Sequence, residues 1–164
     1  MRKLSESELK DVLLKNLPAI DQHGEVVERV GHGEVRLRLP FRKEYLGADV
    51  WGNTGGVVYS GPTAMGFADT AMYGCIHAAL GRDVIPVIAT LTITFLRPAA
   101  AADLIAEARI IRRGKRLVYL ETYLYSEGDA EPIGHVTSTY AIRFREPGLR
   151  ERDGITSQPR LSKG

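Results

Sequence analysis

One acidic residue interrupts the longest apolar stretch of the sequence, and its surroundings suggest chemistry. Asp69 lies inside segment 61–80, which the pattern predicts to be a helix. The residues one turn away on either side are Met65, Gly66, Met72 and Tyr73. None of them is cationic, and a charge among such groups is costly unless something pairs with it. Desolvation would raise the pKa of this carboxyl group and make it a better base near neutral pH. The plain alternative is a buried aspartate hydrogen-bonded to a neighbouring backbone.

The start of the same predicted helix offers backbone donors. Ser60 is expected as the N-cap, and Pro62 fits the first turn, where a missing N–H costs nothing. The N–H of Gly61 is then a candidate oxyanion donor, although Ser-Gly-Pro is also simply a good helix start. Eight residues of helix rise about 12 Å. Gly61 and Asp69 of one helix therefore cannot both reach one carbonyl group, and if both act they come from different subunits.

Basic residues gather around a predicted hairpin at Gly114. The run consists of Arg109, Arg112, Arg113, Lys115 and Arg116. Arg113 and Lys115, together with Arg97, are candidates for holding the phosphates of a ligand, and a solvated hairpin tip is the alternative. The run lacks a groove-reading element, so we expect no nucleic-acid partner.

The remaining reactive side chains predict no metal site. The four histidines show no helical metal-ligand spacing, and we expect His77 to be a hydrogen-bonded core histidine. Cys75 is the only cysteine, which excludes an intrachain disulfide and favours a small buried hydrophobic role. A cytoplasmic location fits best. No membrane span is expected, because Asp69 and His77 break the longest apolar helix.

The chain of 164 residues is expected to form one domain over residues 1–146, with a disordered tail over 147–164. Ser5 and Glu8 have capping-box spacing, which predicts a helix over 6–17. Alternation within 24–40 predicts a strand after a turn at 31–33. Four further strands are predicted at 86–97, 102–113, 115–127 and 131–145. This order indicates an α+β fold in which a curved antiparallel sheet wraps the long helix, and its exposed edges favour a dimer.

Over residues 50–143 the sequence resembles the hotdog-fold thioesterases, specifically the phenylacetate-pathway type of acyl-CoA thioesterase. The matching pieces are Asn53-Thr54-Gly55-Gly56, Ser60-Gly61-Pro62, Ala68-Asp69-Thr70-Ala71 and Phe95-Leu96-Arg97-Pro98. Two further pieces follow in order, Asp103 to Arg109 and Arg113 to Arg116. The order and spacing of these pieces carry the resemblance.

The resemblance implies that Asp69 activates water or attacks the thioester carbonyl of an acyl-CoA. It implies that Asn53 orients the carbonyl group or the water, and it supports Gly61 as the oxyanion donor. Ser60 and Thr63 at the helix start become candidate substrate-binding residues. No cofactor is implied, since coenzyme A is part of the substrate. The expected assembly is a homodimer or a dimer of dimers.

Two departures from the family pattern leave alternatives open. The family's histidine at the helix start is replaced by Ser60, and its following glycine by Pro62. The family's second-strand hydroxyl aligns nearest to Ile88, so Thr90, two residues on and on the same strand face, is a substitute. A non-catalytic protein that binds acyl-CoA is one alternative function. A hotdog dehydratase or hydratase is another alternative, although that reaction usually requires a histidine beside the acid.

Overall fold

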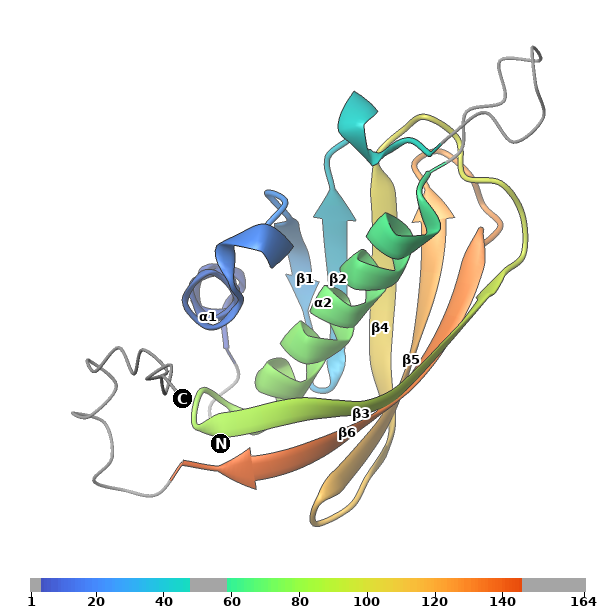
Figure 1. Cartoon of the computed structure of the whole chain (residues 1–164). Coiled ribbons are helices and arrows are strands. Elements are labelled where there is room, and N and C mark those ends of the chain that lie inside the picture. The colour runs from blue at the N-terminus through green and yellow to red at the C-terminus, as the bar shows by residue number, and fades with distance from the viewer. Residues whose placement is uncertain (1–3, 48–58, 146–164) are drawn as a thin grey trace, which may run out of the picture.

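A long central helix crosses the concave side of a six-stranded antiparallel sheet (Figure 1). The computed structural model describes residues 4–47 and 59–145, so the predicted tail at 147–164 lies outside the described residues. The helices are α1 (Glu6–Asn16) and α2 (Gly61–Leu80), with short 3₁₀ turns at Ala19–Asp21 and Lys43–Tyr45. The strands are β1 (Val26–Val30), β2 (Glu34–Leu39), β3 (Val84–Phe95), β4 (Leu104–Arg113), β5 (Leu117–Ser126) and β6 (Gly134–Phe144). Their order in the sheet is β1-β2-β4-β5-β6-β3, which confirms the predicted hotdog architecture.

The first helix begins as the sequence predicts. The Ser5 side chain accepts a hydrogen bond from the Glu8 backbone N–H at 3.2 Å, and the Ser5 N–H donates to the Glu8 carboxylate at 2.8 Å. This reciprocal pair is the capping box. Leu9 and Leu13 then face Gly74 of α2, where an added Cβ would lie 3.7 Å from either side chain. Helix α1 therefore covers one flank of α2, on the β1 side (Figure 1).

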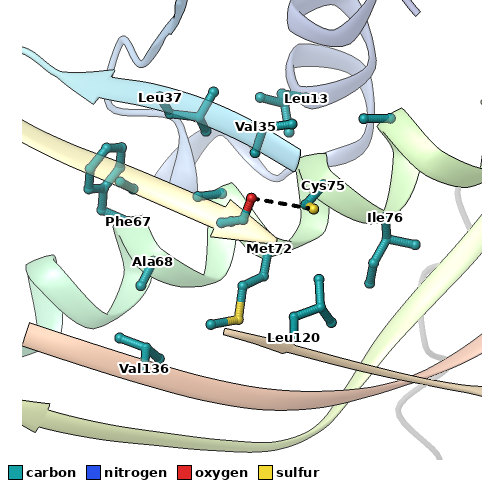
Figure 2. Packing of buried hydrophobic residues seen from close by; sticks show 14 of the residues in the cluster. Leu13, Val35, Leu37, Phe67, Ala68, Met72, Cys75, Ile76, Leu120 and Val136 are labelled. Atoms are coloured by element: carbon teal, nitrogen blue, oxygen red, sulfur yellow. Dashed lines mark hydrogen bonds between the residues drawn. The ribbon is translucent and has the colours of Figure 1, made fainter. Parts of the chain in front are cut away.

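Helix α2 has the predicted ends and is mostly buried. It ends at Gly81, whose φ of 86° lies in the region that favours glycine. Ser60 occupies the N-cap position, but its side chain makes no capping hydrogen bond. Phe67, Met72 and Ile76 fill the space between the helix and the sheet, as Figure 2 shows. No helix in the described part of the chain is both long and apolar enough to cross a membrane.

Strand β3 forms one edge of the sheet and carries an irregularity that bears on the site. Among the described strands it pairs with β6 alone, and its register shifts by one residue between Ile88 and Thr90. Pro86, which has no N–H to donate, is tolerated in this edge strand. Because neighbours along a strand face opposite sides of the sheet, the extra residue reverses the facing of everything that follows it.

Candidate active site

The Asp69 side chain is half-buried in the third turn of α2 and has one clear hydrogen-bond donor. Tyr140 of β6, only 2% exposed, donates its hydroxyl proton to Asp69 Oδ1. The same hydroxyl lies 3.3 Å from the Asp69 backbone carbonyl oxygen. The alternative from the sequence was a backbone donor, whereas the donor found here is a side chain 71 residues away along the chain. Among the described residues, none donates a hydrogen bond to Oδ2, which leaves that oxygen available to a ligand.

Burial raises the pKa of the Asp69 carboxyl group, as the sequence predicts. The hydrogen bond from Tyr140 acts in the opposite direction, and the negative charge of Asp21 raises the pKa slightly further. Burial also raises the pKa of the Tyr140 phenol, with the Asp69 charge adding to the effect. Tyr140 therefore remains a proton donor while Asp69 titrates. A carboxylate poised in this way can act as a base at neutral pH.

Asp69 lies on a flank of α2 that the described residues leave uncovered. One turn before it, Met65 is 37% exposed, and a Cβ added at Gly66 would meet nothing within 4 Å. The neighbouring edge strand β3 exposes Ile88 by 43% and Phe95 by 51%. An acid thus lies beside an open apolar surface, the kind of surface that takes an acyl chain or a second protein molecule.

The start of α2 meets the end of β3. A Cβ built on Gly61 would lie 3.5 Å from the Phe95 ring, and Ser60 and Thr63 are half-buried in the same region. Gly61 and Asp69 belong to one continuous helix, so the separation of about 12 Å worked out from the sequence applies. Asn53, the remaining predicted catalytic residue, lies outside the described residues.

The expectation that Thr90 shares a face with Ile88 is wrong. Ile88 is the register partner of Tyr140, whose side chain lies under α2, whereas Thr90 pairs with Thr139. Adjacent residues on a strand face opposite sides, so Thr139 and Thr90 lie on the outer face of the sheet. The register shift between Ile88 and Thr90 is the physical reason, and it removes Thr90 from the neighbourhood of Asp69.

The predicted cationic residues do not form one cluster. Lys115 lines an outer-face groove of about 630 Å³, whereas Arg113 lines a separate hollow of about 490 Å³ beside His32. Arg97 pairs with Glu131, and Arg109 pairs with Glu121 at 2.5 Å. The groove around Lys115 is lined by Arg112, Gly114, Lys115, Arg116, Leu117, Tyr119 and Thr139. This groove combines cations with an aromatic ring.

His77 and Cys75 are core residues, as the sequence predicts. His77 is fully buried, its Nδ1 lies 2.9 Å from the Gly81 carbonyl oxygen, and burial lowers its pKa. The Cys75 thiol points to the Ala108 carbonyl oxygen at 3.7 Å (Figure 2), and burial raises its pKa to about 12. Within residues 4–47 and 59–145, no three His, Cys, Asp or Glu side chains are grouped so that they could hold a metal ion.

Sequence reasoning missed Tyr140, the residue that contacts the candidate base. The alternation of β6 could have indicated a buried tyrosine, but its hydrogen-bond partner lies on another element. The pairing depends on how α2 crosses the sheet, which no local pattern records.

Comparison with known proteins bears on the fold and the family. The model of the thioesterase superfamily matches residues 55–133, which include Gly61, Asp69 and Arg97. A search of curated protein sequences gives no match for this chain. One similar solved structure is a Silicibacter protein proposed to be a thioesterase, with 28% identity and a TM-score of 0.75. The alignment covers 87% of this chain and 95% of that one.

Two more distant structures share the fold. A thioesterase variant from Pseudomonas aeruginosa has 16% identity and a TM-score of 0.72, covering 88% of this chain and 97% of that chain. A thioesterase from Haemophilus influenzae has 15% identity and a TM-score of 0.70, covering 87% and 93%. The family match and the shared architecture support thioester hydrolysis in general. Residues 55–133, which are 79 of the 164 residues, thus resemble the thioesterase superfamily, and the chain has the hotdog fold.

Proposed function

We propose that this protein hydrolyses acyl-CoA thioesters, with Asp69 as general base or nucleophile. The observation that carries the proposal is the Asp69 carboxylate, whose pKa is raised by burial and which lies beside an open apolar flank. The resemblance of residues 50–143 to phenylacetate-pathway thioesterases supplies the acyl-CoA class. Ser60 and Thr63 lie at the helix start, where they would contact the acyl-thioester end of the substrate.

The site is completed by a second copy of the chain. One copy cannot offer Asp69 and the Gly61 N–H to the same carbonyl group, because they are about 12 Å apart on one helix. No strand among residues 4–47 and 59–145 pairs with the free edge of β3, which exposes Ile85, Val87 and Ile88. Pairing this edge with a second copy would cover those side chains and bring a second α2 to the open flank. A dimer of dimers would retain the same pairs.

Two routes of hydrolysis fit these groups. In the first, Asp69 takes a proton from water as its oxygen attacks the thioester carbonyl carbon, and the Gly61 N–H stabilises the oxyanion. The C–S bond then breaks, and the departing thiolate receives the proton from Asp69. In the second, Asp69 attacks the carbonyl carbon directly, and the C–S bond breaks as the coenzyme A thiolate leaves. Water then hydrolyses the resulting mixed anhydride, which regenerates the Asp69 carboxylate and supplies the proton that the thiolate takes up. Both routes release a carboxylic acid and free coenzyme A.

The basic groove fits the nucleotide end of coenzyme A. Lys115 and Arg116 can hold phosphates, and the Tyr119 ring offers a face for stacking. Thr90 lies on the same outer face, paired with the groove residue Thr139. Arg97 and Arg113 stay candidates for phosphate binding, although Arg97 is already paired with Glu131.

The direct test replaces the acid. Asp69→Asn should retain the fold and oligomeric state but lose about 10²–10⁴-fold in turnover, the usual contribution of a general base. Thiol release from short-chain, long-chain and aryl acyl-CoAs measures the activity. Asp129→Asn, at an exposed turn, is the matched control and should keep the parent rate. If Asp69→Asn also keeps it, the assignment of Asp69 is wrong.

A binding protein without turnover is the second candidate, favoured by the family histidine's replacement with Ser60. Tight acyl-CoA binding with no thiol released by the parent protein would establish it. A dehydratase or hydratase is disfavoured, because the donor to Asp69 is Tyr140 rather than a histidine. Loss of enoyl absorbance without thiol release would support that reaction instead.

A further inference from the structure

We propose that Tyr140 is the positioning residue of the Asp69 carboxylate, holding it in one orientation through the hydroxyl group. This inference rests on the proposed role of Asp69. Tyr140 is almost fully buried, and a buried phenol hydroxyl normally finds a partner. Here it spans two acceptors of one residue, the Asp69 side-chain oxygen Oδ1 and the Asp69 backbone carbonyl oxygen.

The register of the sheet explains why this hydroxyl can reach the acid. Tyr140 lies directly opposite Ile88 across the β3–β6 ladder, on the side of the sheet that faces α2. Ile88 carries no polar group, and Thr90 is turned to the outer face by the register shift. Within the described residues, the hydroxyl group at Asp69 therefore comes from Tyr140 on β6. The sequence had instead suggested Thr90 on the neighbouring strand β3.

The hydrogen bond gives the two oxygens of the Asp69 carboxylate different roles. Oδ1 is occupied by Tyr140, so the rotamer is fixed, and Oδ2 is left for water or the thioester. A hydrogen bond to the charged form favours that form and counters burial. The other titratable groups acting on this pair are Asp21, whose charge raises the Asp69 pKa, and Tyr73, which acts on Tyr140.

Kinetics give the first arm of the test. Activity that needs ionised Asp69 rises with pH through the pKa of that group. Tyr140→Phe keeps the ring but removes the donor, so the acid limb of the kcat profile should move up by about one pH unit. KM should stay unchanged, because the hydroxyl does not contact substrate. Tyr125→Phe, on the outer face, is the matched control and should leave the limb in place.

Carbon-13 NMR of labelled carboxyl and phenol carbons gives an arm that does not depend on turnover. In the parent protein the Tyr140 ring carbon bearing the hydroxyl should shift as Asp69 titrates, and Tyr140→Phe should raise the Asp69 pKa. If the chemical shift of the Tyr140 ring carbon does not change as Asp69 titrates, the proposal is overturned. This measurement uses the parent protein, so it holds even if Tyr140→Phe does not fold. The proposal is also overturned if Tyr140→Phe is only less stable than the parent and the acid limb of its kcat profile does not move. If the parent protein does not hydrolyse acyl-CoA, the proposed function is refuted. The positioning role of Tyr140 is not refuted by that result, because NMR tests it independently of turnover.

Discussion

Mixing two inactive variants tests whether each site is shared between subunits. The first variant is Asp69→Asn. The second is Gly61→Pro, which deletes the proposed oxyanion donor and little else. Ser60 has φ −58° and ψ 128°, an extended conformation compatible with a following proline, and proline is favoured at the first helical position. Gly61→Pro should therefore fold while losing about 10²–10³-fold in kcat.

The expected recovery follows from the geometry. In a heterodimer, the Asp69→Asn chain supplies an intact helix start and the Gly61→Pro chain supplies an intact acid. One of its two sites is then complete and the other has both defects. Random pairing of equal amounts makes about half of the dimers mixed, so the pool should reach about a quarter of the parent activity. This fraction is the same when dimers pair further into tetramers.

The assay compares thiol release by the two variants expressed separately and together. Gly61→Ala is the control for the helix start. It keeps the N–H, and its Cβ would meet the Phe95 ring at 3.5 Å, an ordinary contact. A co-expressed pool that is confirmed to contain heterodimers but is no more active than either variant refutes the shared site. High activity of Gly61→Pro by itself would instead refute the role of the Gly61 N–H.

Two further predictions concern the basic groove and the outer face of the sheet. Lys115→Ala should raise KM for acyl-CoA severalfold and leave KM for the matching acyl-pantetheine unchanged, because only acyl-CoA carries the nucleotide phosphates. Lys10→Ala on α1 is the control. An equal effect of Lys115→Ala on both substrates would contradict the groove assignment. Burial acts to raise the pKa of Glu28, but the hydrogen bonds that its carboxylate accepts from Arg38 at 2.5 Å and Arg36 at 2.8 Å outweigh burial and lower the pKa below its usual value of 4.5. A carboxyl group with a lowered folded-state pKa stabilises the fold above its unfolded pKa and loses that contribution as pH falls through the folded value. Urea unfolding should therefore show stability dropping below about pH 4.5, and Glu28→Gln should flatten that drop; an unchanged slope would contradict the reasoning.

The elements of the fold were predictable because each has a local cause. Ser5 and Glu8 define the start of α1, and Gly81 ends α2. The alternation of Val35, Leu37 and Leu39 reports the buried face of β2. Such signals require only neighbours in the chain, so the sequence predicts them well.

The candidate site was less predictable because its contacts join distant segments. Asp69 stood out by its apolar neighbours, yet Tyr140 became its partner only through the crossing of α2 over β6. The one-residue register shift after Ile88 is not visible in the alternation of residue types along the strand, so the sequence placed Thr90 on the wrong face of the sheet. Arg113 and Lys115 are close in sequence, but they line different hollows because neighbouring residues diverge at a hairpin end.

The inaccessible thiol of Cys75 makes this protein convenient to study. It is the chain's single cysteine, and its pKa of about 12 keeps it protonated at neutral pH. A chromogenic disulfide reagent should thus detect a thiol released from a thioester substrate without reacting with the native protein. On denaturation the same reagent should gain one equivalent per chain, so a single colorimetric measurement can report turnover and loss of structure in one cuvette.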